Sequence, residues 1–369
     1  MRILVAPDCF GGTLSARAAA EAIALGWRRS APADELVLRP LADGGPGFVE
    51  VLHAALGGTV HRLAVTGPLG EPVGADWLEH DGTAYVECAQ ACGLHLVPPA
   101  DRDASSASTR GVGELVNAAL ATGVHTVVIG LGGSASTDGG AGLFAALGAA
   151  PLAEDGTELA PGGGALTGCA RLAAPPEFPA RLVMASDVEN VLLGRHGAAR
   201  TFGPQKGADA AEVEALELAL SRWADVLAEA TGKDVRDTAG AGAAGGLGAG
   251  LLALGAEVVS GAGLVRELTG LDAALASVQL AVTGEGSFDW QSLRGKLITA
   301  VAAGAAERGM PCLVLAGQVS VGRRESAAVG IEDSYAVAEH AGSVEASMAD
   351  PAGTLADLAA HVARQWGGR

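Results

Sequence analysis

The stretch RILVAPDCFGGTLSA (residues 2–16) carries the first signal of the fold. Its opening run RILVAP is almost entirely apolar, which is typical of a strand covered on both faces in a parallel sheet. A glycine-rich turn containing Asp8 follows, and helical spacing then runs from Ser15 to Trp27, with Ser15 as the expected cap. The segment ELVLRP (35–40) predicts a second strand. Such an alternation of strand and helix indicates an α/β domain.

The last third of the chain returns to the same alternation. VQLAVTG (278–284), PCLVLAG (311–317) and DSYAVAE (333–339) predict strands, and helices are expected at about 293–307 and 352–365. The two strands at the start and the three at the end could complete one five-stranded parallel sheet. The middle of the chain would then be inserted as a second domain.

The middle of the chain has a different pattern at its start. TVHRLAV (59–65), EPVGADWLEH (71–80) and TAYVECA (83–89) predict strands joined by tight turns, which indicates an antiparallel or mixed arrangement. Further strands are expected at 125–131 and 181–188, with helices at 109–121 and 211–230. We therefore expect two α/β domains. One is discontinuous and built from residues 1–65 and 272–369, and the other is an inserted mixed α/β domain over 66–271.

The composition excludes several classes of partner. Acidic residues outnumber basic ones by 42 to 24, for a formal charge of −18, whereas nucleic acids and anionic membranes are bound by basic surfaces. The five cysteines lack paired zinc spacing and are expected to be reduced and mostly buried. No signal peptide and no apolar segment suited to a membrane are recognised, so a cytoplasmic protein is expected, as a monomer or a homodimer.

Five of the predicted strands end in turns that hold an acid, and all of these turns except ASDVEN are rich in glycine: APDCFGG, LADGGPG, GLGGSASTDGG (130–140), ASDVEN and VTGEGSFD. In open α/β sheets the carboxyl ends of the strands line the ligand crevice. Glycine there lets backbone N–H groups approach an anion. The 130–140 turn is therefore predicted to cradle a phosphate or a carboxylate. The alternative for any single turn is a tight bend that only requires a positive φ.

The acids of these turns have three possible roles. Carboxylates at strand ends can hold Mg²⁺, deprotonate a hydroxyl group, or cap a following helix. Asp138, directly before two glycines, is a good capping candidate. The acids concerned are Asp8, Asp43, Asp138, Asp187, Glu285 and Asp289.

Lysine usage gives a sharper signal. The chain has only three lysines, and two of them, Lys206 and Lys296, lie in the glycine-flanked segments PQKGA and RGKL. A compact ammonium group suits phosphate coordination, and Arg294 could add a second cation. A Walker A loop is absent, and no dinucleotide fingerprint follows the first strand. P-loop and dinucleotide-binding enzymes are therefore disfavoured.

Nine ordered motifs together resemble the first family of bacterial glycerate kinases, which lack a Walker A loop. The resemblance implies two α/β domains, one of them flavodoxin-like, with the active site in the cleft between them. It also implies phosphorylation of glycerate with ATP and Mg²⁺, usually to 2-phosphoglycerate. The motifs are VAPDCFGGTLSA, PLADGGPG, TGPLG, STRGVGEL, GLGGSASTDGG, DVEN, FGPQKGA, GAGAAGGLG and TGEGSFDWQSLRGK.

With this resemblance, the site residues receive roles in an in-line phosphoryl transfer. Asp8 or Asp43 would polarise the glycerate hydroxyl group, and Asp187 or Asp289 would hold Mg²⁺. Lys206 and Lys296 would bind phosphate oxygens or the glycerate carboxylate, and the backbone N–H groups of Gly132, Gly133 and Ser134 would donate hydrogen bonds there. Glu285 and Arg294 are the further candidates for binding the cofactor.

The chain departs from the family pattern at two positions. It has Gly11 where the family often has lysine, and Pro46 where the family usually has glutamate. Both departures allow a kinase for another small hydroxy acid as an alternative. A non-catalytic regulator that binds a ligand is a further alternative, which the acids and the lysines Lys206 and Lys296 disfavour.

Overall fold

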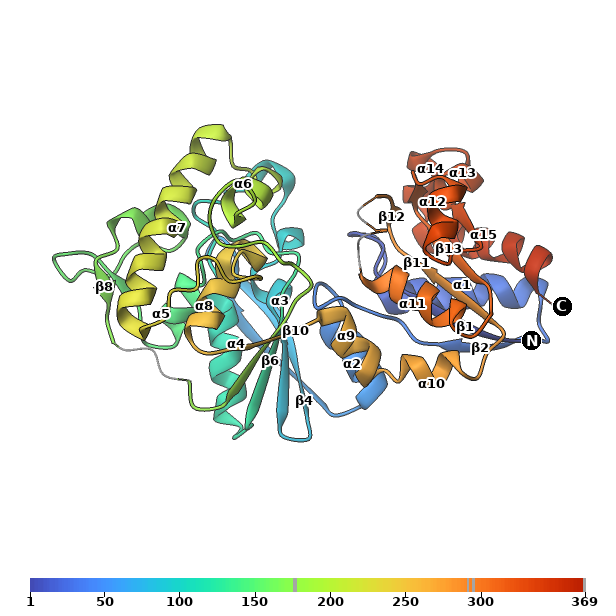
Figure 1. Cartoon of the computed structure of the whole chain (residues 1–369), viewed down its shortest axis with the longest axis horizontal. Helices are drawn as coiled ribbons and strands as arrows, with labels where there is room; N and C mark the ends of the chain where they lie inside the picture. Colours follow the sequence, from blue (N-terminus) through green and yellow to red (C-terminus); the bar gives the residue numbers. More distant parts are fainter. Residues whose placement is uncertain (175–177, 291, 294–295, 368–369) are drawn as a thin grey trace. The chain divides into compact units, whose positions relative to one another are not determined.

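The computed structural model describes residues 1–174, 178–290, 292–293 and 296–367. It divides into two compact units, each described here by itself (Figure 1). The terminal unit comprises Met1–Asp43, Glu50–Leu56 and Ala262–Arg369. The central unit comprises Gly44–Val49 and Gly57–Gly261.

The terminal unit is built on a five-stranded sheet in which every pair of neighbours is parallel. The order is β15-β13-β11-β1-β2. Numbered along the chain from the β2 edge, this is the 2-1-3-4-5 order of flavodoxin-like folds. The predicted sheet, completed by the two ends of the chain, is confirmed. Its strands are β1 (Arg2–Pro7), β2 (Glu35–Leu38), β11 (Leu280–Gly284), β13 (Cys312–Ala316) and β15 (Asp333–Ala336).

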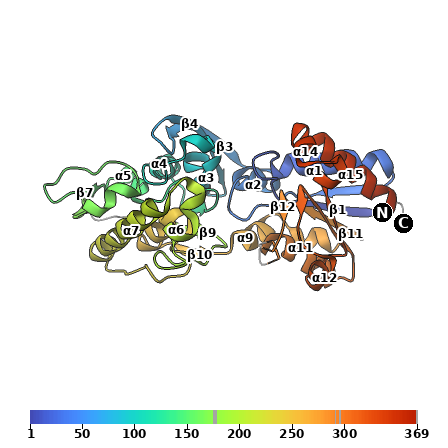
Figure 2. The ribbon, with the colours of Figure 1, turned by 90° about the horizontal axis from the view of Figure 1, so that it is seen from above.

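The apolar run of β1 is explained by helices on both of its faces. Ile3 and Val5 share a buried cluster with residues of α1 (Ala16–Ser30) and α15 (Pro351–Trp366). Leu4 is equally buried but alternates to the opposite face. Helices α1 and α15 pack against each other (Figure 2). Ser15 caps α1 as predicted, because its hydroxyl oxygen accepts a hydrogen bond from the Ala18 amide at 3.2 Å.

Shorter elements complete the terminal unit. A two-stranded ribbon pairs β12 (Ser287–Phe288) with β14 (Gln318–Val319). Helix α11 contacts β11 and β13. The helices are α9 (Gly261–Leu268), α10 (Leu271–Leu275), α11 (Lys296–Ala306), α12 (Arg323–Ala328), α13 (Val337–Ala341) and α14 (Val344–Ala349), with α2 (Phe48–Leu56), whose residues fall in both units.

The central unit contains a mixed six-stranded sheet, in the order β10-β9-β6-β5-β4-β3. The β3–β4 and β4–β5 pairs are antiparallel, and the other pairs are parallel. The short β10 was not predicted, because EVV offers too few residues to show a period. The strands are β3 (Thr59–Thr66), β4 (Pro72–His80), β5 (Thr83–Glu87), β6 (Thr126–Gly130), β9 (Arg181–Ala185) and β10 (Glu257–Val259).

The helices of the central unit enclose a large aliphatic and aromatic core. Trp223 is fully buried on α7 beside Phe144, and its indole N–H donates to the Gly139 carbonyl at 2.9 Å. No helix in the described ranges is long and apolar enough to cross a membrane. The remaining elements are α3 (Cys88–Cys92), α4 (Arg110–Ala121), α5 (Ala141–Ala146), α6 (Ala198–Phe202), α7 (Ala210–Thr231) and α8 (Leu247–Ala253), with β7 (Pro151–Leu152), β8 (Arg171–Leu172) and short 3₁₀ turns.

Candidate functional site

The predicted site residues fall into two groups, one in each unit. The terminal unit holds Asp8, Asp43, Glu285 and Asp289, and the central unit holds residues 132–134, Asp187 and Lys206. Arg294 lies outside the described residues. Lys296 begins α11, but its side chain also lies outside the description.

Asp8 and Glu285 lie at the point where the strand order of the terminal sheet reverses. Asp8 follows β1 and Glu285 follows the neighbouring β11, whose last residues Pro7 and Gly284 are register partners. The Asp8 amide donates to the Gly284 carbonyl at 2.8 Å, which joins the two turns. Ligands of doubly wound folds bind at this switch point, outside the carboxyl ends of the strands.

Burial and neighbouring negative charges act together on the acids of the terminal unit. Burial, followed by the nearby charges of Asp43 and Glu285, raises the pKa of Asp8 to about 8. Burial, with smaller contributions from Asp289 and Asp43, raises the pKa of Glu285 to about 7. The buried Oε1 of Glu285 has no hydrogen-bond partner within the described residues. The group therefore favours either bound protons or a cation.

The carboxylates of both units are the side chains that could bind a metal ion. In the described ranges, no group of three or more His, Cys, Asp or Glu side chains is arranged to hold a metal ion. Mg²⁺ commonly takes only one or two protein carboxylates, with water and phosphate oxygens as its other ligands. Asp289 and Glu285 are close enough for one charge to raise the pKa of the other group. In the central unit, Asp187 accepts a hydrogen bond from the Ser260 hydroxyl at 2.7 Å.

The small residues of the 130–140 turn have a packing reason. A Cβ atom added at Gly132 would lie 2.7 Å from the Gly45 Cα atom, and one at Gly130 would lie 2.5 Å from the Gly44 carbonyl oxygen. Gly44, at a φ of +98°, in turn leaves no room for a Cβ against the Ala185 carbonyl. The turns that follow β2, β6 and β9 thus meet backbone to backbone, which only glycine allows.

The same turn presents unused backbone donors. The Gly133 carbonyl accepts from the Leu94 amide and the Ala135 amide donates to the Cys92 carbonyl, both at 2.7 Å. The amide N–H groups of two successive residues of this turn, Gly133 and Ser134, have no hydrogen-bond partner in the described part of the chain. Successive free amides in a glycine-rich turn form a concavity suited to an anion. This geometry supports the predicted cradle.

Asp138 is fully buried and serves the fold. Its Oδ2 accepts from the Thr109 amide at 2.8 Å, the Thr109 hydroxyl at 2.9 Å and the Gly142 amide at 3.1 Å. Its Oδ1 accepts from the Gly140 amide at 3.1 Å. The carboxylate therefore ties the first turn of α5 to the start of α4, which agrees with its interpretation as a cap.

Lys206 is placed under the 130–140 turn. Lys206 is the last residue of a 3₁₀ turn (Pro204–Lys206), and it is only 2% exposed. The ammonium donates to the Ser134 hydroxyl at 3.0 Å and to the Ser136 carbonyl at 2.5 Å. Burial lowers the pKa of Lys206 to about 8. The sequence analysis predicted that Lys206 binds an anion, whereas the hydrogen bonds of its ammonium in the structure are with protein atoms.

The comparisons with known proteins agree with one another. The model of the glycerate kinase family matches residues 3–367. The chain belongs to the glycerate kinase family. It is 41% identical over 370 residues to the glycerate kinase of Bacillus subtilis, covering 98% of this chain and 94% of that one. It is 43% identical over 327 residues to the glycerate 2-kinase of Escherichia coli, covering 87% and 86%. A crystal structure of a proposed glycerate kinase 2 from Salmonella typhimurium shares the fold with a TM-score of 0.80 and 37% identity, over 99% and 98% of the two chains.

Membership of the glycerate kinase family makes the chain an enzyme of the kinase class, and it agrees with the two α/β units of the structure. The family assignment covers both groups of acids and glycine-rich turns described above, since the match extends over almost the whole chain.

Glu87 is a residue of this kinase that the sequence analysis missed. It ends β5, is 2% exposed, and its Oε2 accepts from the Gly47 amide at 3.1 Å and the Val49 amide at 3.3 Å. It thereby fixes the LADGGPG turn at the start of α2. Burial raises the pKa of Glu87 to about 7. The available signal was an acid directly after the apolar run of a strand, without a glycine beside it.

The segment GAGAAGGLG (240–248), one of the nine motifs of the sequence, has a packing role in the structure. Ala244, Gly245 and Gly246 all have positive φ angles, of +49°, +69° and +87°. The Gly245 carbonyl accepts from the Gly139 amide at 3.1 Å. The segment resembles a dinucleotide fingerprint in sequence, but in this kinase it packs against the 130–140 turn.

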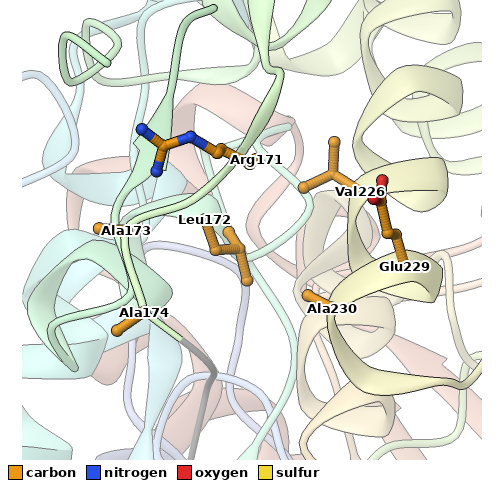
Figure 3. A pocket seen from close by; sticks show the side chains of 7 residues that line it. All are labelled: Arg171, Leu172, Ala173, Ala174, Val226, Glu229 and Ala230. Atoms are coloured by element: carbon orange, nitrogen blue, oxygen red, sulfur yellow. The ribbon is translucent and has the colours of Figure 1, made fainter.

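The central unit also has a hollow between β8 and α7 (Figure 3). Leu172 and Val226 line it, with Arg171 and Glu229 supplying its charged side chains. None of the predicted site residues lies there. The hollow therefore adds nothing to the kinase site.

The raised pKa values predict how stability depends on pH. Asp8, Glu87 and Glu285 hold protons in the folded state at pH values where the unfolded chain has released them. We expect the free energy of unfolding to fall between about pH 5 and pH 8, by up to roughly 1.4 kcal/mol per pH unit for each group still titrating. Urea unfolding at several pH values, with EDTA present, measures this. The variant Glu87→Gln should flatten the dependence; a rise in stability over this range would contradict the assignment.

Proposed function

We propose that this enzyme transfers the γ-phosphoryl group of ATP in line to the 2-hydroxyl group of glycerate, giving 2-phosphoglycerate and ADP. The observation that carries the proposal is the acidic group at the switch point of the terminal sheet, where Asp8 has a pKa of about 8. Proton abstraction is most effective when the pKa of the base lies near the operating pH. The 2-position is supported by 43% identity to a glycerate 2-kinase.

Asp8 is the proposed base. Its carboxylate would take the proton of the glycerate hydroxyl group as the hydroxyl oxygen bonds to the γ-phosphorus and the bond to ADP breaks. Asp43 raises the pKa of Asp8 and so increases its basicity. The short hydrogen bond from the Cys9 amide, at 2.7 Å to Oδ1, fixes the carboxylate in one orientation.

Mg²⁺ fits the acids of the proposed site. Asp289, with the Oε1 of Glu285 that lacks a hydrogen-bond partner among the described residues, offers a two-carboxylate donor set in the terminal unit. Asp187 is the alternative ligand in the central unit. The bound ion would neutralise charge on the phosphate oxygens during transfer.

In the central unit, anions would be held by backbone groups. The free amides of Gly133 and Ser134, with that of Gly132, form the proposed cradle for a phosphate or for the glycerate carboxylate. In the terminal unit, Lys296 begins α11, and the N-terminus of this helix also favours negative charge. Arg294, two residues earlier in the sequence, remains the proposed second cation.

We propose that the enzyme acts in the cytoplasm, on small soluble substrates.

The direct test is ADP formation from ATP and Mg²⁺ with D-glycerate, with phosphorus NMR of the product. We expect turnover that requires both glycerate and Mg²⁺, and a phosphate ester on the 2-position. Reactions without glycerate, and with EDTA, are the controls. An ester on the 3-position would refute the stated regiochemistry while leaving the kinase assignment intact.

A second candidate is a kinase for another small hydroxy acid. Gly11 has no neighbouring atom within 4 Å of an added Cβ, so open space exists where related kinases often carry lysine. No turnover with glycerate, together with turnover of another hydroxy acid by the same protein, would favour this candidate. Ligand binding without any turnover would instead indicate a regulator.

A further inference from the structure

We propose that Lys206 is a positioning residue, which holds the anion cradle in shape from beneath and places a positive charge under it without touching either substrate. The proposal rests on the proposed function, because it assigns a mechanical and electrostatic role within the same cradle. It differs from direct coordination of phosphate, the role predicted from the sequence.

The first argument is enclosure. The Lys206 ammonium is covered on one side by Ser134 and Ser136 of the turn, its two hydrogen-bond acceptors. On another side, a Cβ added at Gly245 would lie 2.8 Å from Nζ and 1.9 Å from the Ser136 carbonyl oxygen. The ammonium is therefore enclosed by protein atoms, and a substrate could contact it only if the turn were displaced.

The second argument is position along the turn. Lys206 binds the hydroxyl of Ser134 and the carbonyl of Ser136. The amides without a hydrogen-bond partner in the described ranges belong to Gly133 and to Ser134 itself. The Lys206 ammonium thus donates hydrogen bonds to Ser134, which carries one of the cradle amides, and to Ser136, two residues further along the turn. Its loss would let these amides rotate away from a common point.

The third argument is charge. The titratable groups that face Lys206 are the thiols of Cys88 and Cys92 on α3 and the carboxylate of Asp138. Asp138 makes its hydrogen bonds with Thr109, Gly140 and Gly142 instead. Within the described residues, both hydrogen-bond acceptors of the ammonium are neutral. A buried charge with neutral partners is costly to the fold. An anion bound on the outer side of the turn would supply the missing opposite charge.

The test compares Lys206→Met with the matched control Lys233→Met, whose side chain is exposed. We expect Lys206→Met to unfold at an equal or higher temperature, since a buried charge is replaced by an apolar chain of similar length. Its kcat/KM for ATP should fall by about 10- to 100-fold, as expected when charge-assisted binding groups lose their alignment. Lys233→Met should match the parent protein in both measurements.

A purely structural lysine would give the opposite stability result, so a lower unfolding temperature with a parallel loss of activity would overturn the proposal. Unchanged activity in Lys206→Met would also overturn it, while leaving the proposed reaction intact if the parent protein turns over. Should the parent protein show no turnover, binding of inorganic phosphate by the same two variants tests the cradle separately. Loss of phosphate affinity in Lys206→Met alone would still support the role of Lys206.

Reductive methylation with ¹³C-formaldehyde separates the indirect role from direct contact. The chain has three lysines, and the two methionine variants assign their signals. We expect Lys206 to resist labelling both with and without ATP, because it is enclosed in the protein itself. Ready labelling that ATP prevents would show that the ligand covers Lys206, and would overturn the proposal.

Discussion

Replacement of Asp8 by asparagine is expected to lower kcat by about 10²- to 10⁴-fold, the range typical of a lost general base. Asparagine keeps the shape of the side chain and can still accept the hydrogen bond from the Cys9 amide. It cannot accept a proton from a hydroxyl group. Steady-state turnover of ATP with glycerate measures the effect, and KM for ATP should change little because Asp8 binds no phosphate in the proposed mechanism.

The stability of Asp8→Asn distinguishes loss of a base from loss of the fold. The variant removes one of several carboxyl groups that raise each other's pKa, so the protein should be at least as stable as the parent at neutral pH. Asp357→Asn is the matched control, since Asp357 is an exposed acid of the same unit paired with Arg29. Full activity in Asp8→Asn would move the role of base to Asp43.

The sheet of the terminal unit could be predicted from local sequence, for a physical reason. A strand covered on both faces must be apolar throughout, so RILVAP, VQLAVTG and PCLVLAG are visible without knowledge of their partners. The order of the strands then follows from the few connections that wound sheets allow. β10 was missed because three residues, two of them exposed, carry no such signal.

The chemistry of the site was less accessible to sequence reasoning. The sequence placed acids and glycines at strand ends, but it could not show that Gly132 is required by the Gly45 backbone. It also could not separate Asp138, whose carboxylate accepts hydrogen bonds from a distant segment of the protein, from Asp8, which accepts from the amide of the next residue, Cys9. These distinctions depend on which distant segments pack together. The hydrogen bonds of Glu87 and the enclosure of Lys206 also depend on segments that are distant in the sequence.

Replacement of Asp138 by alanine is expected to destabilise the central unit by about 3–5 kcal/mol, because several buried hydrogen-bond donors lose their acceptor together. Four donors from Thr109, Gly140 and Gly142 would lose their acceptor in a fully buried place. Each unsatisfied donor carries a cost of about 1–3 kcal/mol before relaxation. Urea unfolding followed by hydrogen exchange of peptides from this unit measures the loss.

A second helix cap in the same unit calibrates this expectation. Asp209 accepts from the amides of Ala211 and Glu212 at the start of α7, but it is exposed, so water can replace it. Asp209→Ala should therefore cost only about 1 kcal/mol. The difference between the two variants isolates the effect of burial, because both remove a carboxylate from the start of a helix. If Asp138→Ala were no less stable than Asp209→Ala, yet inactive, Asp138 would belong to the substrate site, and the free amides at Gly133 and Ser134 would no longer suffice to define it.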